Sequence, residues 1–135
     1  MAKIDARFFE RAKERFEIKF ENVLDIGAAA GDWSSHVKSF YPDAKFTLIE
    51  PNKLLDSIVQ DEKFDLVKID VQGAEVEVIK GGMMTIMNAK WLQIEVPVFQ
   101  YNIGSPSMYN LLGNLKSIGF YPFDIAQSLF NVRCL

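Results

Sequence analysis

Residues suited to metal binding or to cross-linking are scarce in this sequence. Its 135 residues include one cysteine, Cys134, and one histidine, His36. A single cysteine excludes a disulfide within the chain, and one cysteine with one histidine makes a Cys/His zinc site implausible. We therefore expect a domain that an apolar core stabilises without a metal.

Long apolar runs and an excess of positive charge are also lacking. No apolar run approaches the roughly 20 residues that span a bilayer, and residues 1–16 carry charges throughout, without the apolar core of a signal peptide. The 15 lysines and arginines are outnumbered by 18 aspartates and glutamates, which argues against a nucleic-acid partner. We expect a cytoplasmic protein with a single domain over residues 1–135, with neither a membrane nor a nucleic acid as its partner.

Strand-like and helix-like segments alternate along the chain. Short apolar runs predict strands over residues 22–27, 45–50, 64–70 and 90–96, and periodic patterns predict intervening helices. Those helices are expected over residues 4–16, 32–40, 53–60 and 74–89, the last of them interrupted or capped around Gly81 and Gly82. Such alternation is typical of a parallel sheet covered on both faces, an α/β three-layer sandwich.

The end of the chain is expected to add a helix and a pair of strands. Ser105 is the predicted N-cap, Pro106 the first helical residue and Gly119 the terminator. Residues 120–125 and 128–135 are then predicted to form an antiparallel pair.

Carboxylates occur at the ends of all four predicted parallel strands. They are Asp25, Glu50, Asp70 and Glu95. Open parallel sheets bind ligands in the crevice at the carboxyl ends of their strands. The sequence therefore predicts an acidic ligand site at this edge of the sheet.

The loop after the first strand narrows the choice of ligand. Gly27 allows a sharp turn and a close approach of the ligand, and Gly31 opens the next helix. This DxGxxxG pattern, with Ala28 next to the first glycine, lacks the glycine density of a dinucleotide site. Asp25 would repel a phosphate and favour a cationic amino group or a sulfonium, so we expect a ligand without phosphates.

A ribose site is predicted at the end of the second strand, at Glu50 and Pro51. Glu50 follows the glycine loop by about 20 residues, where a carboxylate can accept hydrogen bonds from two ribose hydroxyls. Together with Asp25, Gly27 and Gly31, this pattern fits S-adenosylmethionine, which has a ribose, a cationic amino acid end and no phosphate.

Several stretches resemble the FkbM-type methyltransferases, within the class I S-adenosylmethionine-dependent family. They are residues 23–28, 46–52, 65–75, 78–82 and 91–96, of which the run from Lys68 to Glu75 is the most specific. The resemblance extends from Asn22 to about Asp124. It implies a Rossmann-like, mostly parallel sheet and transfer of a methyl group to a hydroxyl of a small metabolite or sugar.

Two features depart from that family. Its members usually have asparagine at the position of Ala29, and they carry a further strand and helix where this chain has only Asn52 to Lys63. We therefore expect a sheet with one strand–helix unit missing, and an adenine pocket that is open or rebuilt from Leu54, Leu55 and Ile58. The exposed sheet edge predicts pairing with a second copy, a homodimer.

Two acids are the predicted catalytic residues. Asp70 and Glu95 end neighbouring strands beside the expected methyl position, so either can take the proton of a hydroxyl acceptor. Asp70 is also expected to contact the cofactor, whereas Glu75 is expected to hold the backbone amides of Gln72 and Gly73.

Two other functions remain open. A trimmed fold with weak or no cofactor binding would be catalytically inactive. A nicotinamide-dependent enzyme would require the GxGxxG pattern that this loop lacks.

Overall fold

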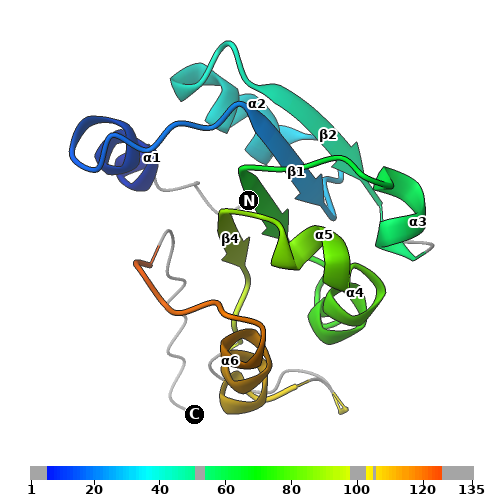
Figure 1. Cartoon of the computed structure of the whole chain (residues 1–135). Helices are drawn as coiled ribbons and strands as arrows, with labels where there is room; N and C mark the ends of the chain where they lie inside the picture. The colour runs from blue at the N-terminus through cyan, green and yellow to red at the C-terminus, as the bar shows by residue number, and fades with distance from the viewer. Residues whose placement is uncertain (1–5, 51–53, 98–102, 105, 126–135) are drawn as a thin grey trace.

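The computed structural model describes residues 6–50, 54–97, 103–104 and 106–125. Within them lie six helices and four strands (Figure 1). The strands are β1 (Asn22–Ile26), β2 (Lys45–Ile49), β3 (Leu66–Ile69) and β4 (Trp91–Ile94). The helices are α1 (Ala6–Glu14), α2 (Asp32–Phe40), α3 (Leu55–Val59), α4 (Glu75–Gly81), α5 (Met83–Met87) and α6 (Met108–Ser117). All four predicted parallel strands and all the predicted helices are confirmed, including the interruption near Gly82.

The strands form one parallel sheet in the order β2-β1-β3-β4. β1 and β3 lie in the centre, where nearly all their residues are buried, and β2 and β4 are the edges. This sheet confirms the predicted Rossmann-like α/β fold. Because only α3 lies between β2 and β3 among the described residues, the chain crosses over β1 with one short helix and without the further strand of the family.

The two faces of the sheet are covered by different helices, which gives three layers (Figure 1). Side chains alternate along each strand, so Val23 and Leu66 join an aromatic cluster with α1 and α2, whereas Leu24 and Val67 join the aliphatic core. That aliphatic core includes residues of α3, α4, α5 and α6.

Two details at the end of the chain correct the expectations. The last helix is capped by Ser107, whose hydroxyl accepts a hydrogen bond from the amide of Asn110 at 3.2 Å, and not by Ser105. Its first helical residue is Met108, so Pro106 precedes the helix. Ser105 itself lies outside the described residues, as do residues 128–135 and Cys134. Gly119 follows the helix with a φ of +94°, as expected of a terminator.

The strand predicted over residues 120–125 is wrong, because this segment is neither strand nor helix. Its side chains pack against distant elements instead. The Phe123 ring lies edge-on to Phe16 and Trp91, and Asp124 forms an ion pair with Arg11 at 2.9 Å.

Among the described residues no helix is both long and apolar enough to cross a membrane. Pairing with a second copy would occur at the outer edge of β2, and it stays a prediction. One side chain of this strand, Leu48, is 46% exposed.

Candidate functional site

Four residues form one row across the carboxyl edge of the sheet, each directly after the strand that positions it. In spatial order they are Glu50, Gly27, Asp70 and Glu95. The amides of the last three donate to carbonyl oxygens of neighbouring strands, at 2.8, 3.1 and 3.2 Å respectively, so the parallel register extends to this row. The structure thus brings together the predicted acids of β2, β3 and β4 with the predicted glycine between them.

Gly27 cannot be replaced by a larger residue without moving the chain. Its φ is +80°, and a Cβ at this position would lie 1.8 Å from the carbonyl oxygen of Asp70. The close approach that this glycine permits is therefore that of the β3 backbone, and it keeps β1 and β3 close together at the site.

The rest of the glycine loop turns into α2. The amide of Gly31 donates to the carbonyl of Ala28 at 2.7 Å, and Gly31 has a φ of +78° as the N-cap of the helix. Ala28 is buried, and Ala29 has a φ of +45°, a conformation that asparagine adopts more readily than alanine. The tight turn expected here is confirmed.

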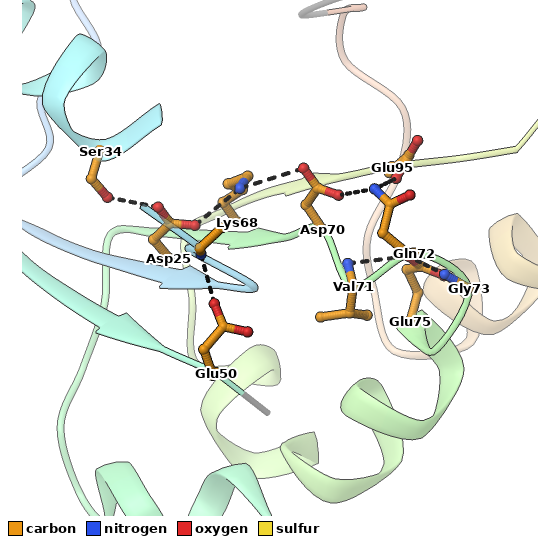
Figure 2. Close-up of polar contacts among 11 residues, drawn as sticks. Asp25, Ser34, Glu50, Lys68, Asp70, Val71, Gln72, Gly73, Glu75 and Glu95 are labelled. Carbon is orange, nitrogen blue, oxygen red and sulfur yellow. Dashed lines mark hydrogen bonds and ion pairs between the residues drawn. The ribbon is translucent and has the colours of Figure 1, made fainter. Parts of the chain in front are cut away.

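Glu50 is exposed, follows β2 directly and is hydrogen-bonded to the glycine loop. Its Oε1 accepts a hydrogen bond from the amide of Ala29 at 2.6 Å (Figure 2). No described residue donates to its Oε2, which leaves one oxygen able to bind a ligand hydroxyl. Pro51, predicted at the same site, lies outside the described residues.

Asp25 lies one row behind this edge, inside β1, with a side chain that is 0% exposed. Its two oxygens accept hydrogen bonds from Ser34 at 2.7 Å and from Lys68 at 3.1 Å (Figure 2). The expectation that Asp25 ends its strand is therefore wrong. The register pairs Asp25 with Lys68, so an ion pair spans the two central strands on the face that α2 covers.

Asp70 and Glu95 share one hydrogen-bonding side chain. Gln72 Nε2 lies 3.0 Å from Asp70 Oδ1 and 3.4 Å from Glu95 Oε2 (Figure 2). Partial burial, and next the Asp70 carboxylate, raise the pKa of Glu95 above its ordinary value, while Lys68 opposes the rise. A carboxylate with a raised pKa is suited to accept a proton from a bound hydroxyl.

Glu75 is 2% exposed and organises the loop after β3. Its Oε1 accepts hydrogen bonds from the amides of Gly73 at 3.1 Å and Val71 at 3.4 Å. The predicted backbone role is confirmed at Gly73, with Val71 in place of Gln72. This loop is strained at Gln72, where φ is +54°.

The residues expected to line an adenine pocket are not grouped as expected. Of the three residues expected to line an adenine pocket, Leu55 is buried in the aliphatic core, whereas Leu54 and Ile58 are exposed. In the described part of the chain no three acids, cysteines or histidines are grouped to hold a metal ion.

Sequence reasoning missed Lys68, Ser34 and Gln72 as parts of this site. Lys68 gave the clearest signal, because a charged residue inside a buried apolar strand requires a partner. Its spacing of two from Asp70 also places both side chains on one face of β3.

The chain matches a family model and one curated protein. The model of the methyltransferase FkbM domain matches residues 52–122. The Methyltransferase sdnD of Sordaria araneosa is 33% identical over 72 residues, which cover 53% of this chain and 24% of that protein. The chain therefore spans about a quarter of the length of this relative. No solved structure matches the chain. Asp70, Glu75 and Glu95 lie inside the region that the family model matches, whereas the glycine loop and Glu50 precede it.

Proposed function

The chain belongs to the FkbM methyltransferase domain family, and we propose that it transfers a methyl group from S-adenosylmethionine to a hydroxyl group of a small metabolite or sugar. One observation carries the proposal most directly. It is the row of three carboxylates and one glycine at the carboxyl edge of the parallel sheet, where such sheets bind ligands.

The residues of this row fit the proposed cofactor. The Oε2 of Glu50, to which no described residue donates, can accept a hydrogen bond from a ribose hydroxyl beside the loop that Gly27 begins. Ala28, Gly31 and Pro51 belong to the same proposed cofactor set, together with Asp70. Asp25 forms a buried ion pair with Lys68, so its proposed role is to stabilise the site from the buried row next to it.

The chemistry requires little more than alignment. S-adenosylmethionine, when bound, supplies a methyl group on a sulfonium, so that positioning of the acceptor provides most of the acceleration. Asp70 and Glu95 lie at the adjacent strand ends, where one of them takes the proton that the acceptor hydroxyl loses. Proton transfer at this point leaves the acceptor oxygen free to form its new bond to carbon.

Binding of S-adenosylhomocysteine tests the cofactor assignment. Replacement Glu50→Ala should weaken binding by about 1–3 kcal/mol in isothermal titration, because a ribose hydroxyl loses a charged acceptor. Glu62→Ala is the matched control, since Glu62 forms only an exposed ion pair with Lys45 at 3.3 Å. Equal affinities of the Glu50→Ala variant and the wild type would refute the ribose assignment.

A catalytically inactive form of the fold is the second candidate. The observation that favours it is the short connection through α3, which leaves β2 as an edge and Leu54 67% exposed. A wild-type dissociation constant above about 1 mM for S-adenosylhomocysteine, worth roughly 4 kcal/mol, would support this candidate over the enzyme.

A further inference from the structure

Lys68 is a cation inside the central strand of the sheet. Its side chain is only 8% exposed, although β3 is otherwise apolar. Burial of an ammonium group is costly unless charged partners compensate for the lost water. The partners of Lys68 therefore indicate what the residue does.

Three side chains surround the Lys68 ammonium. Its Nζ lies 3.1 Å from Asp25 Oδ1, 3.5 Å from Asp70 Oδ2 and 5.4 Å from the centroid of the Trp33 ring. Asp25 and Trp33 are both buried, whereas the Asp70 side chain is 39% exposed. Lys68 thus connects the buried side chains of Asp25 and Trp33 to the carboxylate of Asp70 at the open edge of the site (Figure 2).

This connection makes the two candidate bases unequal. Asp70 has a partner on each oxygen, since Lys68 approaches Oδ2 and Gln72 donates to Oδ1 at 3.0 Å. Glu95 accepts the longer contact from Gln72, at 3.4 Å, and no described cation lies within ion-pair distance of it. Its other close neighbour is the Asp70 side chain, and partial burial, followed by the charge and hydrogen bonding of Asp70, raises the pKa of Glu95. Asp70 is therefore held in one orientation, and Glu95 is the freer of the two.

We propose that Lys68 is a positioning residue that fixes Asp70 to receive the cofactor and thereby leaves Glu95 to take the proton of the acceptor hydroxyl. The inference rests on the proposed function. In the step it describes, the hydroxyl oxygen forms a bond to the methyl carbon while the carbon–sulfur bond breaks. The proton moves to a carboxylate oxygen of Glu95, and the sulfur leaves with the electron pair as S-adenosylhomocysteine.

The electrostatics of the site support this division. Partial burial and the Asp70 carboxylate raise the pKa of Glu95, which suits a group that must accept a proton. Lys68 acts to lower the pKa of Glu95, because its charge stabilises nearby negative charge. That stabilisation is strongest at the carboxylates that Lys68 contacts.

A charge-neutral pair of substitutions tests the positioning role. Asp25→Asn with Lys68→Met removes one charge of each sign, so the local net charge that a cationic ligand meets is unchanged. We expect this double variant to bind S-adenosylhomocysteine about tenfold more weakly in isothermal titration, because Asp70 loses its fixed orientation. In an Asp70→Asn background the same pair should change the affinity less than about twofold, since the residue through which Lys68 acts is already altered.

The matched control removes an aspartate–lysine pair at the amino end of β3. Asp65→Asn with Lys90→Met breaks an ion pair of 2.6 Å at the opposite edge of the sheet and should leave the affinity within about twofold of wild type. Circular dichroism checks that each variant is folded. If the Met variant does not fold, Asp25→Asn with Lys68→Gln, which keeps hydrogen-bonding groups at both positions, takes its place in the cycle.

Single variants test the division between the two acids. Asp70→Asn should weaken binding about tenfold, whereas Glu95→Gln should change it less than about twofold. Equal losses in both variants would overturn the division, and an effect of the Asp25–Lys68 pair that is the same with and without Asp70 would overturn the positioning role. Failure of the wild type to bind S-adenosylhomocysteine would instead refute the proposed function, and this inference with it.

Discussion

The two ends of β3 each carry an aspartate, and the surrounding structure satisfies these two carboxylates differently. Asp65, at the amino end, accepts hydrogen bonds from the amides of Glu21 and Asn22 at 2.8 and 2.9 Å and from Lys90 at 2.6 Å. Asp70, at the carboxyl end, contacts side chains alone among the described residues. The exposed fraction of the side chain is 11% at Asp65 and 39% at Asp70.

This difference separates a carboxylate that stabilises the fold from one that is available to a ligand. The Asp65 carboxylate accepts hydrogen bonds from two backbone amides and a lysine, so that it links the start of β1 to β3. The amides near Asp70 instead belong to the strand ladder or to Glu75, which leaves Asp70 facing the open edge. Substitutions at the amino edge should therefore change stability, and substitutions at the carboxyl edge should change ligand affinity unless they alter the backbone.

The largest effect is expected where the backbone itself forms the site. Gly27→Ala places a Cβ 1.8 Å from a carbonyl oxygen at a φ of +80°, so the variant should lose about 4 kcal/mol of unfolding free energy or fail to fold. Urea denaturation and soluble yield measure this loss. Gly113→Ala is the control, because a Cβ in the middle of α6 meets nothing within 4 Å and should stabilise the helix by about 0.5–1 kcal/mol. A Gly27→Ala variant as stable as the wild type would show that β1 and β3 are not so close at this edge.

Asp65→Asn should have the next largest effect, and on stability alone. Burial acts to raise the pKa of Asp65, but hydrogen bonds from Lys90, Asn22 and Glu21 outweigh it and hold that pKa below its ordinary value. The stabilisation is therefore complete above the ordinary aspartate pKa of about 3.9 and is lost as the pH falls through the lower value of the folded state.

We expect the Asp65→Asn variant to lose about 2 kcal/mol of unfolding free energy at pH 7, with a smaller difference from wild type at pH 2. Urea denaturation at the two pH values measures it, and Asp61→Asn, in an exposed turn, should change stability by less than about 0.5 kcal/mol. A loss that is constant with pH would mean that the carboxylate charge is not what Asp65 contributes.

The architecture was predictable because its signals are local. Parallel strands buried on both faces appear as continuous apolar runs, and β1, β3 and β4 lie within the runs that predicted them. The helix predicted over residues 32–40 has those bounds in the structure, since Gly31 and the segment around Pro42 delimit it.

The site was predictable only as far as topology determines it. Parallel strands end at one edge, so Glu50, Asp70 and Glu95 had to gather there. The burial of Asp25 depends on which face of β1 is covered by α2, and the packing of Phe123 on Phe16 and Trp91 is a contact between distant segments. Neither property is present in a local pattern.

Ser34→Ala tests the buried layer behind the open edge, with a smaller expected effect. Ser34 is 5% exposed and donates at 2.7 Å to Asp25, so its loss leaves a buried carboxylate with one partner fewer and should cost about 1.5 kcal/mol. Ser39→Ala is the matched control on the same helix, because Ser39 is exposed and bonds only to the carbonyl of His36. Thermal unfolding of the two variants should differ clearly, and equal melting temperatures would show that Asp25 does not depend on Ser34.

The smallest effect is expected at Glu95, with a sign opposite to that at Asp65. Because partial burial and Asp70 raise the pKa of Glu95, the folded state binds its proton more tightly than the unfolded state does. Its contribution to stability is then present below the ordinary glutamate pKa of about 4.3 and is lost as the pH rises through the raised value.

Glu95→Gln removes this titration, so the variant should exceed the wild type by about 0.5 kcal/mol at pH 7, after allowance for solvent screening, and equal it near pH 3. Glu62→Gln, which breaks the exposed ion pair with Lys45, should show no such gain at pH 7. Urea denaturation across this pH range measures both variants. A destabilised Glu95→Gln variant at pH 7 would mean that hydrogen bonds stabilise the carboxylates at the carboxyl edge as they stabilise Asp65 at the amino edge. The contrast between the two ends of β3 would then no longer hold.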